Sequence, residues 1–162
     1  MKAIETIYQG YRFRSRLEAR WACYFNAMSF KYFYEHEGFD LGDIGWYLPD
    51  FYLPHVKMWA EVKPEKFNND ELKKAEALVI FTKKPLLMLE GPPERRVYYA
   101  LCFDGHCKPN GTYGVDFILS NYHEYYKKEQ RFFGNCGYET EVFEDWFDDI
   151  DIGVTVARSA RF

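Results

Sequence analysis

The stretch WYLPDFYLPHVKMWAEVK, residues 46–63, holds the features that decide the fold expected for this chain. Residues 46–53 and 58–62 are rich in aromatic and branched side chains, and a few turn-prone residues separate them. This is the pattern of a β-hairpin. Pro54 cannot donate a backbone hydrogen bond to a neighbouring strand, so we expect the first strand to end there.

Three charged side chains fall close together in this hairpin. Side chains alternate between the two faces of a strand, so Glu61 and Lys63 are predicted to project from one face while Val62 points to the other. Asp50 lies late in the first strand, and a short hairpin brings Glu61 beside it. Two carboxylates on neighbouring strands form a hard oxygen site. Such a site suits Mg²⁺, which keeps several waters and completes its shell with phosphate oxygens.

The chemistry predicted from this set is metal-assisted hydrolysis of a phosphodiester bond. A bound cation stabilises charge on the phosphate and lowers the pKa of a bound water. Lys63 is predicted to hold either the attacking water or the scissile phosphate and to stabilise the developing negative charge. Two alternatives remain: each residue is solvated surface, or Glu61 and Lys63 form a purely structural pair, since a buried charge needs a partner.

Several segments in the same order resemble the PD-(D/E)XK nuclease superfamily, which has the restriction-endonuclease-like fold. The likeness is to small phage and bacterial members with a first helix of the type FRSRLEARWA, here residues 13–22. It covers roughly residues 10–92 and the last few residues, whereas residues 93–150 carry none of it. Beyond the helix, the matching segments are Tyr34-Glu35, Pro49-Asp50-Phe51, Glu61-Val62-Lys63-Pro64, residues 84–92 and residues 157–162.

The resemblance implies a Mg²⁺-dependent DNA endonuclease of phage or mobile-element origin, with Mn²⁺ as the expected substitute cation. It implies that Asp50 and Glu61 are metal ligands and that the carbonyl of Val62 completes the metal shell. It makes Lys63 the catalytic lysine. Glu18, on the first helix, belongs by the same resemblance to the catalytic site, as a ligand through water or as an orienting carboxylate.

The residues around Glu18 also support a second interpretation. Ser15-Arg16-Leu17-Glu18 fits a capping box, in which the Glu18 side chain bonds the Ser15 backbone and starts the helix. A capping role does not exclude a site nearby, so both interpretations stay open. Arg14 and Arg16 are candidates for contacts with DNA phosphates, which supply most non-specific affinity. The alternative is that both arginines belong to a solvated helix face.

Periodicity predicts a mixed α/β fold, with a central mixed sheet flanked by helices. The expected α-β-β-β-α-β order matches the restriction-endonuclease-like core that the resemblance implies. We expect a single domain over residues 1–162, with a core at about 10–92 and a loop-rich extension at 93–162. The core elements are a helix at 15–28, strands at 31–37, 46–53 and 58–62, a helix from an N-cap at Asn69 or Asp70 to about 81, and a buried strand at 86–89.

The extension has weaker signals. Glycines at five positions between residues 105 and 137 indicate a loop-rich region, where substrate recognition is expected to reside. The same region shows two expected edge strands at 97–103 and 113–119, a helix or loop at 122–133, and a helix at 141–147 whose continuation toward the C-terminus stays open.

Composition and charge narrow the expected location and partners. No run approaches the ~18 apolar residues needed to span a bilayer, and residues 1–6 lack the apolar centre of a secretion signal. We therefore expect a cytoplasmic protein without a membrane partner. The net charge of −4 argues against DNA as a partner, but it is unevenly distributed: residues 1–100 hold 15 Lys and Arg against 14 Asp and Glu, and residues 101–162 hold 6 against 11.

The acidic run at residues 144–149, EDWFDD, motivates a second hypothesis. In this view the chain is a catalytically inactive binding or inhibitory module, whose carboxylates mimic phosphates toward a basic protein partner or which binds nucleic acid. A solvated helix face is the other explanation of the run. The sequence leaves open whether the substrate is DNA or RNA and whether one subunit or a homodimer acts.

Four cysteines complete the candidate residues. Cys23 lies within the predicted first helix and is expected to be a small buried hydrophobic residue. Cys102, Cys107 and Cys136, with His106, lack the close pairs of ligands that are usual in zinc sites, so we expect reduced thiols.

Overall fold

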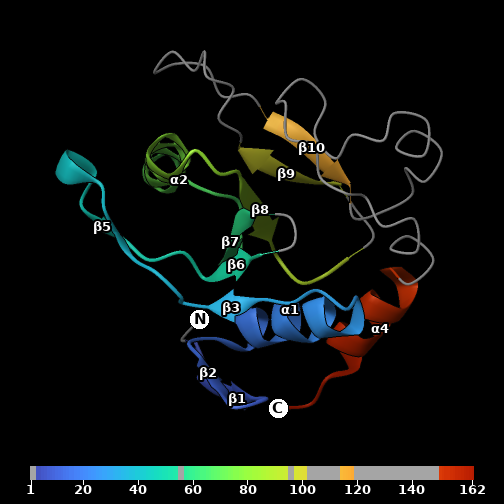
Figure 1. Cartoon of the computed structure of the whole chain (residues 1–162). Coiled ribbons are helices and arrows are strands. Elements are labelled where there is room, and N and C mark those ends of the chain that lie inside the picture. The colour runs from blue at the N-terminus through green and yellow to red at the C-terminus, as the bar shows by residue number, and fades with distance from the viewer. Residues whose placement is uncertain (1–2, 55–56, 95–96, 102–113, 119–149) are drawn as a thin grey trace.

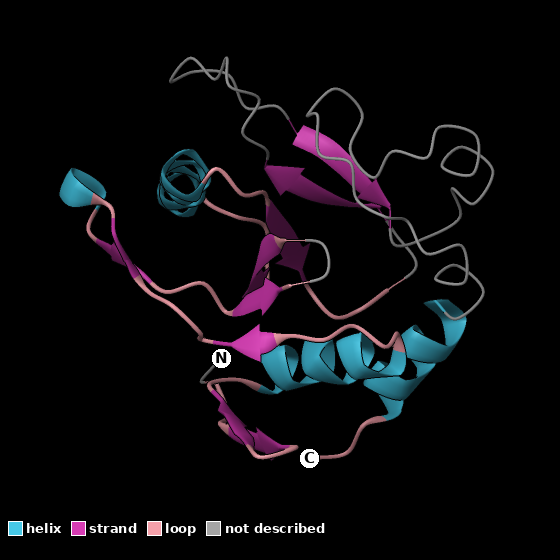
Figure 2. Cartoon of the chain, in the orientation of Figure 1, coloured by secondary structure: helices cyan, strands magenta, loops and turns pink. Residues whose placement is uncertain are grey.

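A computed structural model describes residues 3–54, 57–94, 97–101, 114–118 and 150–162. In these residues the chain forms a central mixed sheet with helices on both faces (Figures 1 and 2). The prediction of a mixed α/β fold is therefore confirmed. Neither the 122–133 segment nor the 141–147 helix can be compared, because both lie outside the described residues.

The central sheet has the strand order β10-β9-β8-β7-β6-β3 over the described part of the chain. Its centre is a parallel pair, β7 with β8, and all its other pairs are antiparallel. Parallel neighbours need a crossover connection, which α2 supplies. The bounds are β3 Phe33–Tyr34, β6 Phe51–Leu53, β7 Met58–Lys63, α2 Asn69–Thr82, β8 Leu86–Glu90, β9 Val97–Leu101 and β10 Gly114–Ile118.

One face of the sheet is covered by α1 (Arg16–Ala27), as the apolar spacing of its sequence predicts. Trp21 and Phe25 on this helix are buried in one cluster with Phe51 and Val62 of the sheet. The helix α4 (Ile150–Ser159) packs beside α1 and adds to the same cluster (Figure 1). Cys23 is buried here, as expected.

The other face is covered by α2, whose apolar side packs on Trp59 and Leu86. Its N-cap is Asn68, one residue before Asn69 and two before Asp70, which are the two predicted N-caps. The Asn68 side chain accepts hydrogen bonds from the backbone of Asp70 and Glu71, while the Glu71 carboxylate accepts one from the Asn68 backbone. This reciprocal capping box decides the start of the helix.

The predicted strand at 46–53 is wrong as a single element. The structure divides it into β5 (Trp46–Tyr47) and β6 (Phe51–Leu53), and β5 pairs with β4 (Phe39–Asp40) in a separate two-stranded ribbon. The short 3-10 helix η1 (Gly42–Ile44) joins the two strands of this ribbon. The division falls at Pro49, which has no backbone donor for a ladder.

The strand predicted at 31–37 is reduced to β3. Glu35, directly after it, has a φ of 44°. A left-handed backbone of this kind cannot continue a strand, so the pairing stops at Tyr34. The strands β1 (Thr6–Tyr8) and β2 (Tyr11–Phe13) of the N-terminal hairpin, the strand β4 and the 3-10 helix η1 were not predicted. The helix α4 lies where the sequence left the continuation of the 141–147 helix open.

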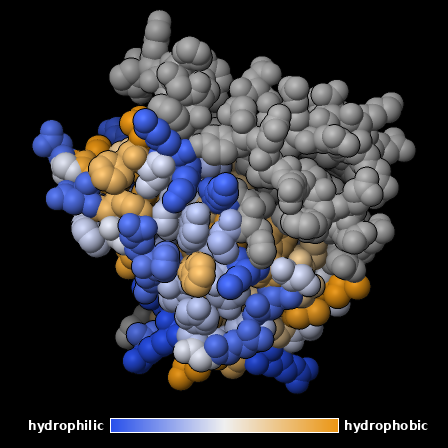
Figure 3. Space-filling view, viewed as in Figure 1, coloured by the Kyte–Doolittle hydropathy of each residue, from blue (hydrophilic) through white to orange (hydrophobic). Residues whose placement is uncertain are grey.

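Hydrophobic residues on the surface gather in two places. In the view of Figure 3 they lie near the end of α2 and the β4–β5 ribbon, and again over α4. The exposed side chains in these places include Ile44, Ile80 and Phe81 in the first and Ile152 and Val156 in the second. None of the described helices has the length and apolar character that crossing a bilayer requires.

Candidate active site

The central strand β7 positions two of the three charged residues singled out in the sequence. Val62 is buried in the cluster on the α1 face of the sheet. Glu61 and Lys63 project from the opposite face, where their side chains form an ion pair of 2.9 Å between Lys63 Nζ and Glu61 Oε1. The predicted alternation along this strand is therefore confirmed.

Asp50 lies opposite Glu61 at the end of the hairpin. The β6–β7 register pairs Phe51 with Ala60, so the next pair toward the open end is Asp50 with Glu61. Here side chains replace the regular ladder. The Val62 N–H donates to Asp50 Oδ2 at 2.7 Å, and the Asp50 N–H donates to Glu61 Oε2 at 3.3 Å. These bonds hold the two carboxylates side by side.

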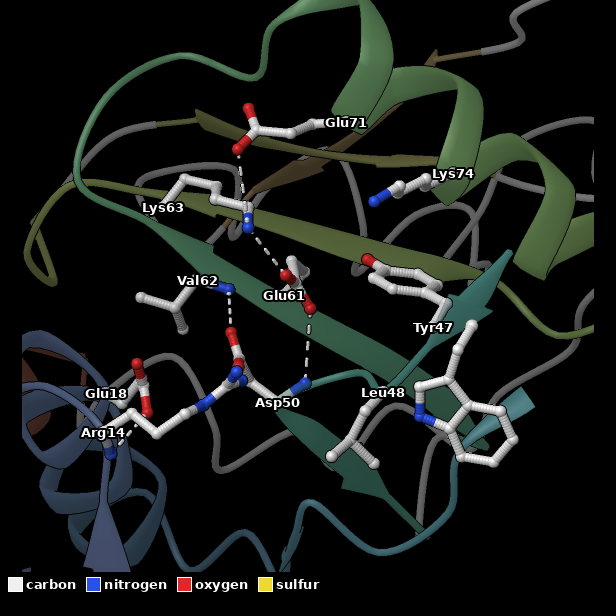
Figure 4. A pocket seen from close by; sticks show the side chains of 11 residues that line it. Arg14, Glu18, Tyr47, Leu48, Asp50, Glu61, Val62, Lys63, Glu71 and Lys74 are labelled. Carbon is white, nitrogen blue, oxygen red and sulfur yellow. Dashed lines mark hydrogen bonds and ion pairs between the residues drawn. The ribbon is translucent and has the colours of Figure 1, made fainter. Parts of the chain in front are cut away.

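A cavity of about 560 Å³ opens over this pair (Figure 4). Asp50, Glu61 and Lys63 share it, so the structure brings together the residues that the sequence predicted to meet. Arg16 does not line the cavity; it lies exposed at the start of α1. The lining residues are Arg14, Glu18, Trp46, Tyr47, Leu48, Asp50, Glu61, Val62, Lys63, Glu71 and Lys74.

The two carboxylates are unusually costly to ionise. Asp50 is 2% exposed and Glu61 is 4% exposed. Burial raises the pKa of Asp50 well above its ordinary range, and the charges of Glu61 and Glu18 raise it further. Burial also raises the pKa of Glu61, although Lys63 and the Asp50 N–H partly offset the shift. A cation placed between these carboxylates would remove their mutual repulsion.

Lys63 is held as a cation by its neighbours. Burial by itself would lower the pKa of Lys63, but the charges of Glu61 and Asp50 and the hydrogen bond to Glu61 raise it above the ordinary value. Its Nζ also lies 3.5 Å from a carboxylate oxygen of Glu71 on α2. Lys63 therefore stays protonated at neutral pH and acts as a hydrogen-bond donor.

Arg14 crosses from the α1 side to reach the carboxylates. Its Nη2 lies 2.6 Å from Asp50 Oδ1, and its Nε lies 2.7 Å from Glu35 Oε1. Two further arginines of this segment are used elsewhere: Arg12 pairs with the exposed Glu5, and Arg20 donates to backbone carbonyls near the end of α4. The segment therefore offers the cavity one arginine.

Glu18 caps α1 in a modified form and also lines the cavity. Ser15 caps α1 by accepting from the Glu18 N–H, and the Ser15 hydroxyl donates to Glu18 Oε1 at 2.8 Å. In a regular capping box the Glu18 carboxylate would accept from the Ser15 N–H; here its Oε2 accepts from the Arg14 N–H instead. The Tyr34 hydroxyl donates to the same oxygen. Glu18 therefore starts the helix and also forms one wall of the cavity.

Sequence reasoning missed the role of Tyr47 beside Glu61. Burial raises the pKa of the Tyr47 hydroxyl, and the charges of Glu61 and Asp50 raise it further, so the hydroxyl stays protonated in the cavity beside Glu61. We find no sequence signal for Tyr47, because its position depends on the unpredicted β4–β5 ribbon.

The helix α2 contributes two further residues, Glu71 and Lys74. They are three residues apart, and residues at this spacing share one face of a helix. Helical periodicity therefore predicts that the two side chains share a face of α2, whereas the packing of α2 on the sheet decides that this face borders the cavity.

The donor set fits a hard divalent cation. Among the described residues no group of three or more His, Cys, Asp and Glu side chains is arranged to hold a metal ion. Mg²⁺, however, is commonly bound through only one or two carboxylates, with waters and substrate phosphates in its other positions. Asp50 and Glu61 supply that number, and the repulsion between them favours a cation.

Comparison of the chain with protein-family models, with curated proteins and with solved structures gives no match. Any function assigned to the cavity is therefore argued from the contacts, burial and charges of its residues.

Proposed function

We propose that this protein is a Mg²⁺-dependent nuclease that hydrolyses phosphodiester bonds of DNA as an endonuclease. The observation that carries the proposal is the meeting of two buried carboxylates, Asp50 and Glu61, with the protonated Lys63 in one cavity. Apart from the β4–β5 ribbon, the order α1-β3-β6-β7-α2-β8 with a parallel β7–β8 pair supports the resemblance to a restriction-endonuclease-like topology.

In this proposal Asp50 and Glu61 hold the cation together with the carbonyl of Val62. When bound, Mg²⁺ or Mn²⁺ supplies positive charge to the scissile phosphate and lowers the pKa of a bound water. The two carboxylates are fixed by backbone hydrogen bonds, those from the Val62 N–H and the Asp50 N–H. These backbone bonds preorganise the two carboxylates, which favours electrostatic stabilisation of a transition state. Binding of the cation then requires only the side-chain ion pairs with Arg14 and Lys63 to rearrange.

Lys63 is assigned to the phosphate as a donor of hydrogen bonds. The ion pair of 2.9 Å with Glu61 holds the ammonium group of Lys63 at the cavity, beside the position proposed for the phosphate. A protonated ammonium group stabilises the negative charge that develops on the phosphate oxygens. Glu18 supports the site from the side by fixing the backbone of Arg14 and the hydroxyl of Tyr34.

Cleavage assays test the proposal. The purified full chain is incubated with linear, nicked, branched and single-stranded DNA in Mg²⁺, in Mn²⁺ and in EDTA. We expect cutting that needs the divalent cation and a rate at least about 100-fold lower for Asp50→Asn, since removal of one preorganised electrostatic group commonly costs this much. Asparagine keeps an acceptor for the Val62 N–H, so the fold is expected to persist. Asp43→Asn, on the exposed η1, is the matched control and should cut normally.

Equal cutting by the wild type and Asp50→Asn would assign the activity to a contaminant and overturn the proposal. Absence of cutting on every substrate, together with a calorimetric titration that shows no uptake of Mg²⁺ or Mn²⁺, would favour the alternative of a catalytically inactive binding module.

A further inference from the structure

Trp46 is the most exposed tryptophan of the described chain. Its exposed fraction is 66%, whereas Trp21 is 0% and Trp59 is 1% exposed. It begins β5 in the ribbon that stands apart from the central sheet. Exposing a large aromatic ring to water is unfavourable, so a ring placed in this way suggests a contact that the isolated chain does not make.

The ring of Trp46 is nevertheless held in one position, against the backbone of Gly38. A Cβ atom built on Gly38 would overlap the six-membered ring of Trp46, with the Cε2 atom at 2.7 Å and the Cη2 atom at 3.0 Å. The φ of Gly38 is not positive, so the backbone conformation does not require glycine there. The close approach of the Trp46 ring is what leaves no room for a side chain at this position. The ring rests against bare backbone on one side and keeps most of its surface in solvent.

This ring lines the same cavity as the two carboxylates. Trp46 and Tyr47 form the wall that the ribbon contributes, and Asp50, Glu61 and Lys63 form the wall on the sheet. The volume of about 560 Å³ lies within the range of roughly 300–1,000 Å³ that is usual for a small-molecule site. A ligand that contacts the carboxylates through a cation and a phosphate can therefore reach the indole with its next group.

We propose that Trp46 is a stacking site for an unpaired nucleobase, so that the substrate is DNA with a single-stranded or extrahelical nucleotide next to the phosphate that is cut. This inference rests on the proposed nuclease function and specifies its substrate class. Bases stack on exposed aromatic side chains regardless of sequence, because every base has a flat aromatic face. A base within a duplex is covered on both faces by its neighbours and cannot offer one to Trp46.

The charge of the cavity favours a nucleotide over an apolar protein segment. Seven of its eleven lining residues are charged, and covering them with apolar side chains would leave buried charges without solvent. A nucleotide brings a neutral base to Trp46 and a phosphate to the cationic groups. Lys74 has no ion-pair partner among the described side chains, so its ammonium group is available to that phosphate.

Binding is tested with the full chain in EDTA, so that no cleavage is required. The probes are a single-stranded oligonucleotide containing 2-aminopurine, a fluorescent base whose emission falls on stacking, and the fully paired duplex of the same sequence. We expect the single strand to bind more tightly than the duplex and its emission to fall. Trp46→Leu should weaken binding of the single strand by about 5- to 150-fold and abolish the fall in emission, with duplex binding unchanged.

Three further variants make the test specific. Trp46→Phe keeps an aromatic face and should retain most of the binding. Gly38→Ala leaves the indole intact, but the added methyl group overlaps the ring and displaces it. This variant should therefore also bind the single strand more weakly than the wild type. Phe81→Leu is the matched control, because Phe81 is 62% exposed but does not line the cavity; its binding should equal that of the wild type.

The inference is overturned if Trp46→Leu binds the single strand as tightly as the wild type. It is also overturned if Trp46→Phe is as weak as Trp46→Leu, or if Phe81→Leu is equally impaired. A protein that stacks the probe through Trp46 but cuts no DNA in Mg²⁺ would overturn the proposed nuclease function alone. A protein that cuts DNA but loses no binding in Trp46→Leu would overturn the stacking site alone.

Discussion

The guanidinium group of Arg14 contacts one carboxylate oxygen of Asp50. Its Nη2 lies 2.6 Å from Asp50 Oδ1, and this side chain is 55% exposed. If Asp50 is a metal ligand, a cation must compete with Arg14 for this oxygen. The released arginine would then be free to contact a phosphate, which is the role that the sequence suggested for it.

We therefore expect Arg14→Gln to bind Mn²⁺ about 2- to 5-fold more tightly than the wild type. A partly exposed ion pair contributes only about 0.2–1 kcal/mol, which limits the size of the gain. Isothermal titration calorimetry measures it. Arg12→Gln is the matched control, since Arg12 pairs with Glu5 and does not line the cavity. An unchanged or weaker affinity in Arg14→Gln would show that Arg14 does not compete with the cation.

The raised pKa of Asp50 has a consequence for stability. The folded state binds a proton at Asp50 more tightly than the unfolded state, where the pKa is about 3.9. Binding of this proton contributes to the free energy of unfolding. The contribution is complete below the unfolded-state pKa and is lost as the pH rises through the pKa of Asp50 in the folded state. Without divalent cations, the free energy of unfolding of the wild type should thus fall, relative to Asp50→Asn, from about pH 4 toward neutral pH.

Urea denaturation in EDTA at several pH values measures this difference. Asp43→Asn again serves as the control, because Asp43 is exposed on η1 and does not line the cavity. If the difference between the wild type and Asp50→Asn stayed constant with pH, burial and the charge of Glu61 would not be raising the pKa of Asp50.

At the scale of single elements, the sequence predicts what depends on local pattern. The apolar spacing in α1 and the continuous apolar run of β8 predict both elements within a few residues. The alternation in β7 predicts which side chains face the cavity. Each of these signals is complete within one segment, so no long-range contact is needed to interpret it.

The ribbon β4–β5 could not be predicted in the same way. Trp46 and Tyr47 look like the start of the strand that ends at Leu53, and only the pairing of β5 with β4 separates them from it. The sequence therefore predicts the carboxylates and the lysine of the cavity, but misses the aromatic wall that Trp46 and Tyr47 form. That wall is a product of tertiary pairing.

The contact between α1 and α4 depends on a glycine. A Cβ atom at Gly153 would lie 2.8 Å from Met28 Sδ and 3.0 Å from Tyr24 Cε2. We expect Gly153→Ala to destabilise the protein by about 1 kcal/mol. Overpacking costs about 1–3 kcal/mol, and the better helix propensity of alanine offsets up to about 1 kcal/mol of it.

Urea denaturation of Gly153→Ala and of Thr155→Ala measures this effect. Thr155 is exposed on the same helix, so its replacement gains helix propensity without overpacking and should stabilise slightly. Stabilisation of both variants would show that α1 and α4 do not approach as closely at Gly153 as the structure indicates.

At the scale of the whole molecule, the site lies where the two apolar clusters of the sheet leave an opening. The cluster under α1 and the cluster under α2 bury both faces of β7, and the charged residues follow at the end of that strand. A central strand fixed on both faces holds Glu61 and Lys63 rigidly. The cavity then takes its outer walls from α1, from α2 and from the ribbon.

The net charge of −4 gives this protein little general attraction for DNA. Arg12, Arg14 and Arg20 are already bonded to protein groups, so Lys74 is a main candidate for a phosphate contact. Each phosphate neutralised by a side chain releases counterions and adds about −0.9 to the slope of log K against log salt for duplex DNA, or about −0.7 for single strands. Few such contacts give weak binding with a shallow dependence on salt.

Lys74→Ala should therefore weaken binding of oligonucleotides of any sequence and reduce the magnitude of the salt slope by about one. Fluorescence anisotropy in EDTA between about 50 and 200 mM salt measures both effects. Lys73→Ala removes the same charge from the adjacent position on α2, but Lys73 lies 3.8 Å from Asp70 and does not line the cavity. The two variants have the same net charge. If a phosphate binds in the cavity, Lys74→Ala should therefore lower the affinity and the salt slope more than Lys73→Ala does. Equal slopes for Lys73→Ala and Lys74→Ala would mean that nucleic acid binds elsewhere on the molecule.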